Sequence, residues 1–317
     1  MFYKIEARGV GESIIHVFGL GDYDLSDTLE CGQCFRHELI KKEGGYVEYL
    51  TVAKDRLMRV GQSVRGELLF YDMNEEDFLS VAVPYFDLDT DYTVIRDEII
   101  SLTDSDFLKR AAMAAGGIAI LRQDAWESLV SFIISQNNNI PRIKKIVKRI
   151  CTEYGENLSY KSGAEKCPLN RIDTPPCEEK CRECGACYSF PSASDINADP
   201  EKMLPAKVGF RYKYLCDAAK RIDTGTTNLQ EIAAAASYEV TCEELKKILG
   251  VGDKVAACVA LFGFRNMEAF PIDVWMKRAI DEHFGGSLDP KSLGKYAGVA
   301  QQYIFHYMRS LTDTVSK

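Results

Sequence analysis

Hydrophobic and polar residues alternate over short runs in the first part of the chain, whereas hydrophobic residues recur at helical spacing in the later part. Runs such as GYVEYLTVA and LMRVGQSV, bounded by glycine-containing turns, are typical of antiparallel strands up to about residue 75. From Glu75 onward the spacing predicts helices joined by tight loops. The pattern therefore predicts an α+β protein in which an antiparallel sheet precedes an all-helical region.

Two of the predicted helices carry clear start signals. The segment DAWESLVSFII begins with Asp124 at the N-cap and Glu127 at the capping-box position, and a second helix begins near Pro141. Their hydrophobic stripes consist of Trp126, Leu129, Val130 and Ile133 in the first and of Ile143, Ile146, Val147 and Ile150 in the second. The other face of the second helix carries Arg142, Lys144, Lys145, Lys148 and Arg149. This basic face suits phosphate groups, and a merely solvent-exposed face is the alternative.

The segment CEELKKILGVGDKVAACVALFGF predicts two helices joined by a Gly-Val-Gly turn, which is a helix-hairpin-helix pattern. Gly250 and Gly252 allow a tight turn and a close approach to a phosphate, which the amides at the start of the second helix can bind. A plain hairpin between two helices is the alternative interpretation.

Two ionisable residues stand at predicted helix starts. Lys254 lies in the first turn of the second hairpin helix, where the helix dipole and partial burial disfavour an ammonium group and favour the free amine of covalent catalysis. Asp273 follows Pro271 at an N-cap position, and its carboxylate can stabilise positive charge on a sugar. A surface lysine and an ordinary helix cap are the alternatives.

Composition describes a globular chain of two domains, with 317 residues, 46% hydrophobic and 27% charged. No apolar run approaches the roughly 18 residues of a membrane-spanning helix, and MFYKIEARGV lacks the apolar core of a signal peptide. We therefore expect a cytoplasmic protein with no membrane partner. If the organism is a prokaryote, we expect it with the nucleoid.

The net charge of −8 is unevenly distributed. Residues 1–110 carry 12 Lys and Arg against 22 Asp and Glu, whereas the remaining residues carry 27 against 25. Because phosphate binding depends on local potential, a DNA partner fits the later part of the chain, and an acidic small-molecule enzyme is the alternative.

Eleven cysteines in a chain without a secretion signal indicate thiols or metal ligands rather than disulfides. A Cys-rich insertion at about residues 162–190 supplies four thiolates at the spacing of a closed zinc site: Cys177, Cys181, Cys184 and Cys187. We predict structural zinc there, with Cys167 as a substitute ligand. An iron-sulfur [4Fe-4S] cluster or metal-free thiols are the alternatives.

The segments ILGVGDKVAACVALFGF and PIDVWMKRA resemble the helix-hairpin-helix, Gly/Pro-rich loop and aspartate signature of the HhH-GPD DNA glycosylases. Four further segments resemble the 8-oxoguanine DNA glycosylase/AP lyase branch, in its order and across essentially the whole chain: CGQCFRHE, SQNNNIPRIKKIVKRIC, VGFRYKYL and YAGVAQQYIF. The resemblance implies a sheet domain similar to half of the TATA-binding protein over residues 1–115. A helical glycosylase domain would follow over residues 116–317.

By this resemblance, the flipped base enters a pocket between Cys258 and Phe305, and Gln301 binds its Watson-Crick edge. The Gly32 carbonyl would accept a hydrogen bond from N7–H, which 8-oxoguanine has and guanine lacks. Asn137, Arg142 and Arg211 would hold the cytosine left behind, and Phe210 would fill the vacated stack. Gly250 and Gly252 would bind a phosphate with a monovalent cation.

The resemblance also implies the reaction, excision of 8-oxoguanine opposite cytosine in duplex DNA during base-excision repair. Lys254 would attack C1′, Asp273 would support the sugar, and the Schiff base would allow β-elimination without a catalytic cofactor. We expect a monomer. The alternatives are another oxidised purine lesion or a non-catalytic DNA-binding module. The chain departs from animal members of the family at Trp275 and Met308, which replace a histidine and its acidic partner and put one phosphate contact in doubt.

Overall fold

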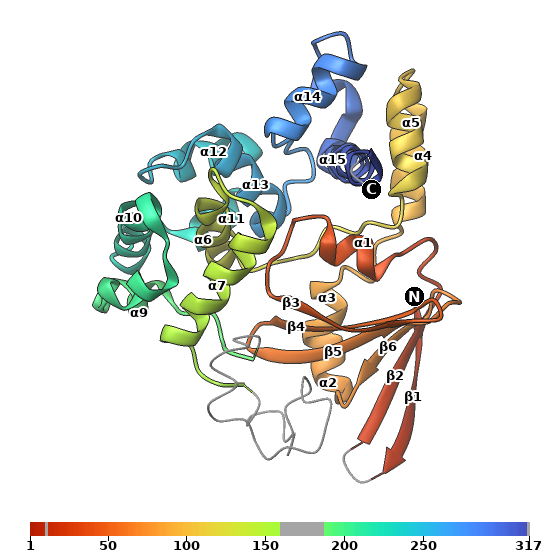
Figure 1. Ribbon diagram of the computed structural model, residues 1–317, viewed down its shortest axis with the longest axis horizontal. Coiled ribbons are helices and arrows are strands. Elements are labelled where there is room, and N and C mark those ends of the chain that lie inside the picture. Colours follow the sequence, from red (N-terminus) through yellow and green to blue (C-terminus); the bar gives the residue numbers. More distant parts are fainter. Residues whose placement is uncertain (10–11, 159–186, 316–317) are drawn as a thin grey trace.

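The first region of the computed structural model is a six-stranded antiparallel sheet (Figure 1). The structure describes residues 1–9, 12–158 and 187–315. The strands pair in the order β1-β2-β6-β5-β4-β3. Their bounds are β1 (Phe2–Gly9), β2 (Glu12–Phe18), β3 (His37–Glu43), β4 (Tyr46–Ala53), β5 (Arg56–Gln62) and β6 (Leu68–Tyr71). The predicted sheet up to about residue 75 is confirmed.

One face of the sheet is covered by short helical turns that follow it in the chain. These are α2 (Glu75–Asp77), a π-helical turn (Phe78–Ala82) and α3 (Val83–Tyr85). The buried ring of Phe70 on β6 makes edge contacts with Phe78 and Phe86, with centroid distances of 5.3 and 5.5 Å. These aromatic contacts join the sheet to the following helices in one core.

Two helices that precede residue 115 pack with the C-terminal part of the chain. These are α4 (Tyr92–Ser101) and α5 (Asp106–Ala114), which lie beside α15 (Ala297–Val315) in Figure 1. Phe107 of α5 stacks on His283 at 3.8 Å and contacts Tyr307 at 5.5 Å. The sheet region and the helical region therefore share these helices as a common boundary.

The helical region surrounds the apolar helix α6 (Ala125–Ser135), which packs against α13 (Asp253–Phe264). Among the described residues of this region, the other α-helices besides α15 are α7 (Ile140–Tyr154), α9 (Ala193–Ala198), α10 (Tyr212–Asp223), α11 (Leu229–Ala235), α12 (Tyr238–Lys246) and α14 (Val274–His283). The described residues also form three 3-10 segments between these helices: Pro200–Ala206, Gly209–Arg211 and Pro290–Tyr296. Within the described ranges, no helix is long and apolar enough to cross a membrane.

Half of the predicted capping box on α6 is wrong. Asp124 caps the helix by accepting a hydrogen bond from Glu127 N at 2.9 Å. The Glu127 side chain instead accepts from Arg36 Nη1 at 2.8 Å. The Arg36 side chain is largely buried. A buried guanidinium without a counter-charge costs more free energy than a helix end that lacks a second cap, so Glu127 pairs with Arg36.

The basic face of α7 partly serves to dock the sheet region. Its predicted stripe of four hydrophobic residues is buried, as expected. On the opposite face, Lys144 Nζ lies 3.1 Å from Glu30 Oε2 and Lys148 Nζ lies 2.7 Å from Glu38 Oε1. These two lysines therefore pair within the protein, whereas Arg142 is exposed.

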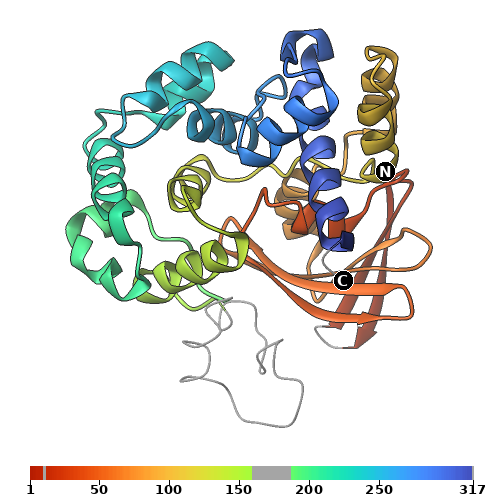
Figure 2. The same cartoon turned by 45° about the horizontal axis from the view of Figure 1, so that its top comes forward.

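The C-terminal helix holds the short helix α1 (Leu25–Glu30) that leads to Gly32. Figure 2 shows the end of α15 beside α1 and the sheet. Arg309 Nη1 donates to Glu30 O at 3.3 Å, and His306 Nε2 lies 3.4 Å from Asp27 Oδ1. These contacts position the turn after α1, which lines the candidate pocket.

Candidate active site and DNA-binding surface

The predicted hairpin is present between α12 and α13, and its two glycines have different roles. Gly250 has a φ of +80°, and a Cβ atom there would lie 2.4 Å from the ring of Tyr214. Gly252 has a φ of −100° and open space where its Cβ would stand. The fold therefore requires glycine at 250, whereas at 252 the missing side chain leaves room for a ligand.

Lys254 occupies the first turn of α13 and is half-buried. Its Nζ donates a hydrogen bond to Ser135 Oγ at 3.1 Å and lies 5.3 Å from the ring centroid of Phe132. Both partners belong to α6. The packing of α6 on α13 thus fixes the amine beside a neutral hydroxyl and an aromatic face.

Asp273 is the N-cap of α14, as predicted. Its Oδ1 accepts a hydrogen bond from Met276 N at 2.9 Å. The cap fixes the orientation of the carboxyl group, because the Met276 amide holds one of its two oxygens.

One pocket brings together six of the predicted residues: Gly32, Lys254, Cys258, Asp273, Gln301 and Phe305. The other lining residues are Cys31, Phe132, Phe262, Pro271 and Gln302. The lining combines an amine, a carboxylate and two carboxamides with aromatic walls. Such a mixture suits a planar polar ring beside a group that can act as a nucleophile.

Gly32 stands where no side chain fits. Its φ is +87°, and a Cβ atom would lie 3.1 Å from Ile140 Cδ1 and 3.5 Å from Phe305 Cε1. Both the left-handed backbone conformation and the lack of space for a Cβ atom therefore favour glycine. Without a side chain, the backbone itself forms the pocket wall beside Phe305.

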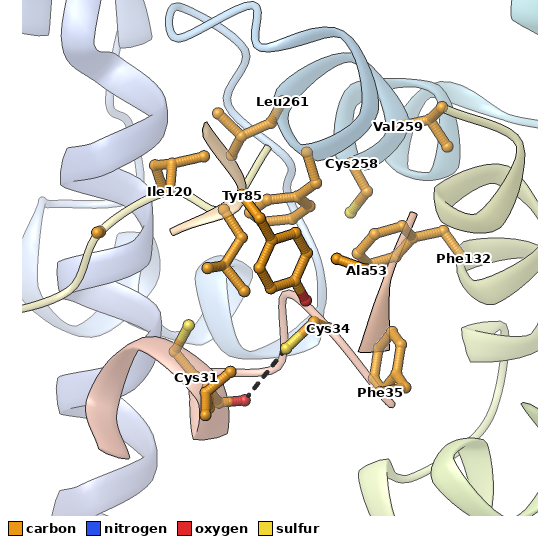
Figure 3. Packing of buried hydrophobic residues seen from close by; sticks show 14 of the residues in the cluster. Cys31, Cys34, Phe35, Ala53, Tyr85, Ile120, Phe132, Cys258, Val259 and Leu261 are labelled. Atoms are coloured by element: carbon orange, nitrogen blue, oxygen red, sulfur yellow. Dashed lines mark hydrogen bonds between the residues drawn. The ribbon is translucent and has the colours of Figure 1, made fainter. Parts of the chain in front are cut away.

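Cys258 lies deep in the pocket wall on α13, and Figure 3 shows it beside Phe132 within the buried cluster. Burial raises the pKa of the Cys258 thiol, although nearby Lys254 acts in the opposite direction. Cys258 is therefore a neutral thiol at physiological pH and forms an apolar, polarisable surface.

Gln301 and Gln302 are adjacent on α15 and both buried. Gln302 Nε2 donates to Gln301 Oε1 at 2.7 Å. This bond fixes both carboxamides at the pocket wall. Of the two, only Gln301 was predicted from the sequence to line the pocket.

The residues predicted to hold the opposite cytosine also lie together. Arg211 is buried and donates to three main-chain carbonyl oxygens, those of Gln136, Asn137 and Val208. Asn137 and Arg142 are exposed. Burial lowers the pKa of Arg211, and the positive charge of nearby Arg142 lowers it further. Arg211 therefore holds the main chain of the loop that contains Asn137, and Arg142 lies nearby.

Phe210 is an exposed aromatic residue beside this group. The residue is 50% exposed, and the guanidinium of Arg211 lies 4.4 Å from its ring centroid. Its ring also contacts Tyr214 edge-on at 6.1 Å, and Tyr214 packs where Gly250 lacks a side chain. An exposed phenylalanine held at its base is available for insertion between bases.

The pocket and neighbouring residues that sequence reasoning missed include Phe132, Ser135 and Gln302. Phe132 and Ser135 lie on a helix whose periodicity indicated only a buried stripe. Gln302 directly follows the predicted pocket residue Gln301. A second polar residue in this hydrophobic helix is a sequence signal that could have identified it as a pocket residue.

A family model and a solved structure both match this chain. Residues 17–129 match the family model described as 8-oxoguanine DNA glycosylase, N-terminal domain. A solved structure of MBOgg1 in complex with a low-affinity DNA ligand is 34% identical, with a TM-score of 0.80, and the match covers 98% of this chain and 100% of that one. The chain belongs to the 8-oxoguanine DNA glycosylase family. This confirms the predicted family and the α+β fold.

Two further members support the assignment. The 8-oxoguanine glycosylase/lyase of Clostridium acetobutylicum, solved with double-stranded DNA containing cytosine opposite 8-oxoguanine, is 31% identical with a TM-score of 0.79 over 98% of this chain and 99% of that one. The N-glycosylase/DNA lyase of Saccharomyces cerevisiae is 29% identical over 80% of this chain, which spans 66% of the yeast protein's length. The predicted enzyme class, DNA glycosylase and AP lyase, is therefore confirmed.

The structure describes only one of the four predicted zinc ligands, and it describes both positions that depart from the animal members of the family. Cys177, Cys181 and Cys184 lie outside the described residues, so the metal site stays a prediction, while Cys187 is buried. Met308 is buried in the core and Trp275 packs against that core, in agreement with their apolar character.

Proposed function

We propose that this enzyme excises 8-oxoguanine opposite cytosine from duplex DNA, with Lys254 as the nucleophile. The observation that carries the proposal is the pocket in which Lys254 and Asp273 share a wall with Gly32, Cys258 and Phe305. A base inside a duplex cannot reach such a pocket, so the damaged nucleotide must rotate out of the stack.

The pocket walls account for recognition of the flipped base. Its ring lies between Cys258 and Phe305, and Gln301 binds its Watson-Crick edge. The Gly32 carbonyl accepts a hydrogen bond from N7–H of 8-oxoguanine and opposes the N7 lone pair of guanine, a difference of about 1–3 kcal/mol for a buried group.

The chemistry begins with the lone pair of the Lys254 amine, which attacks C1′ of the flipped nucleotide. The bond between C1′ and N9 breaks, and its electron pair leaves with the base, which takes up a proton. Asp273 stabilises the positive charge that develops on the sugar. Ring opening gives a Schiff base, a proton then leaves C2′, and the C3′–O bond breaks with loss of the 3′ phosphate.

The remaining contacts hold the distorted duplex. Phe210 fills the vacated stack, and Asn137 and Arg142 contact the cytosine, whose O2 and N3 accept hydrogen bonds. The buried Arg211 holds the loop that carries Asn137 in place. Amides around Gly250 and Gly252 bind a phosphate, with a monovalent cation at the hairpin. Neutralised phosphates make the affinity salt-dependent.

Single-turnover assays on matched duplexes test the proposal. The lesion is 8-oxoguanine, another oxidised purine or unmodified guanine, each placed opposite cytosine, and 8-oxoguanine is also placed opposite the other three bases. We expect base release from 8-oxoguanine opposite cytosine to be fastest. Faster release of another oxidised purine would support the alternative lesion, and binding without release would support a non-catalytic module.

A structural zinc ion at Cys177, Cys181, Cys184 and Cys187 is proposed on the sequence alone. Metal analysis of the purified protein tests it, with one equivalent of zinc expected. Iron with acid-labile sulfide would support the cluster instead, and absence of both metals would leave free thiols.

A further inference from the structure

Gln302 has a buried oxygen to which no group of the described residues donates a hydrogen bond. The residue is 4% exposed, lines the pocket and donates through Nε2 to Gln301 Oε1. Within the described ranges, Gln302 Oε1 is buried and unpaired. A buried unpaired carbonyl oxygen costs stability, and at a ligand pocket it indicates a partner that arrives with the ligand.

The two linked carboxamides present an ordered set of hydrogen-bonding groups. Along the pair these are the Gln301 Nε2 donor, the second lone pair of Gln301 Oε1 and the free Gln302 Oε1 acceptor. The order is donor, acceptor, acceptor, the same as on the Watson-Crick edge of cytosine. Turning both carboxamides over would give acceptor, donor, donor.

We propose that Gln302 is a second base-recognition residue, whose Oε1 accepts a hydrogen bond from the 2-amino group of flipped 8-oxoguanine. The proposal rests on the proposed function of the pocket. The edge of 8-oxoguanine offers O6 as acceptor, then N1–H and the 2-amino group as donors. Gln301 matches the first two groups and Gln302 the third. The pair therefore selects 2-amino-6-oxopurines over bases without the 2-amino group.

A pair of substrates isolates this contact. One duplex contains 8-oxoguanine opposite cytosine, and the other contains 8-oxohypoxanthine, which lacks only the 2-amino group. We expect the wild-type protein to release 8-oxoguanine about 10- to 100-fold faster. Gln302→Met keeps the chain length but removes both the free acceptor and the Nε2 donor that holds Gln301. It should slow release of both bases, because Gln301 loses its orientation. It should slow release of 8-oxoguanine about 10-fold more than release of 8-oxohypoxanthine, because only 8-oxoguanine loses the contact to its 2-amino group.

Tyr303→Phe is the matched control, because Tyr303 lies on the same helix and carries a buried hydroxyl without a partner among the described residues, but does not line the pocket. This variant should leave the ratio of the two rates unchanged. Equal slowing of both substrates by Gln302→Met would overturn the role of Gln302 and leave the proposed function intact. Equal wild-type rates on both substrates would do the same without any variant. A wild-type protein inactive on both would refute the proposed function and this inference with it.

Discussion

Lys254 Nζ donates a hydrogen bond of 3.1 Å to Ser135 Oγ, at the last residue of α6. The next two residues, Gln136 and Asn137, offer their carbonyl oxygens to Arg211. The end of α6 therefore contacts both the proposed nucleophile and the arginine that anchors the proposed cytosine site. A shift of this helix end would therefore move the amine of Lys254 and the side chain of Arg211 together.

Ser135→Ala should slow base release by roughly 3- to 10-fold, because the Lys254 amine loses the group that orients it. Affinity for lesion-containing duplex should stay the same, since Ser135 is not among the pocket-lining residues. Single-turnover rates and equilibrium binding on one substrate separate the two effects. An unchanged rate would show that Ser135 does not position the lysine.

Arg211→Ala should lower the free energy of unfolding by about 2–4 kcal/mol, since it leaves three main-chain carbonyl groups without their donor. Arg142→Ala is the matched control at an exposed arginine and should change stability by less than about 0.5 kcal/mol. Both variants should weaken the preference for cytosine opposite the lesion. Urea unfolding and rates opposite each base provide the comparison. Equal stability of the two variants would contradict the anchoring role of Arg211.

Gly250→Ala should lower the stability of the fold, whereas Gly252→Ala should lower the affinity for DNA. The first places a methyl group against Tyr214 in a left-handed conformation and should cost at least about 1–2 kcal/mol of stability. The second enters open space and should leave stability nearly unchanged while weakening DNA binding, because the methyl group occupies the approach of the phosphate. Thermal unfolding and DNA titrations measure the two effects. Normal DNA affinity of Gly252→Ala would argue against a phosphate at this turn.

The buried His37 should make the protein less stable in mild acid. Its Nε2 lies 2.6 Å from Lys144 Nζ and 3.2 Å from Glu30 Oε1, and its Nδ1 lies 3.4 Å from Cys34 Sγ. Burial lowers the pKa of His37 below its ordinary value of 6.5, Glu30 opposes this shift and Lys144 adds to it. The folded state therefore binds the proton less readily than the unfolded state. The stabilisation is complete above pH 6.5 and is lost as the pH falls through the lowered pKa.

Urea unfolding between about pH 7.5 and pH 5 tests this dependence. The free energy of unfolding should fall below about pH 6.5 in the wild type and fall less steeply in His37→Gln. Identical slopes would assign the acid sensitivity to other groups.

Local patterns in the sequence were enough to predict the elements that hold the candidate catalytic residues. The glycines of the hairpin, the lysine after them and the cap at Asp273 are all local signals, and the structure has them in the predicted places. The resemblance then grouped residues as distant as Gly32 and Phe305 in one pocket, as the structure also does.

Contacts between distant segments could not be predicted in this way. Ser135 and Lys254 are separated by 119 residues and meet only because α6 packs on α13. Glu127 occupied a capping-box position, but the buried Arg36 from the other region of the fold takes its carboxylate. Arginine side chains are usually exposed. Only the three-dimensional fold shows that Arg211 is buried and which carbonyl groups accept its hydrogen bonds.

Borohydride trapping tests the central claim most directly. The protein and its Lys254→Gln variant are incubated with a duplex containing 8-oxoguanine opposite cytosine and sodium borohydride, then separated on a denaturing gel. A Schiff base between Lys254 and the sugar would be reduced to a covalent complex, so the wild type should give a shifted band that the variant lacks. A wild-type protein that binds this duplex without forming the complex, or a variant that forms it as well, would contradict the account.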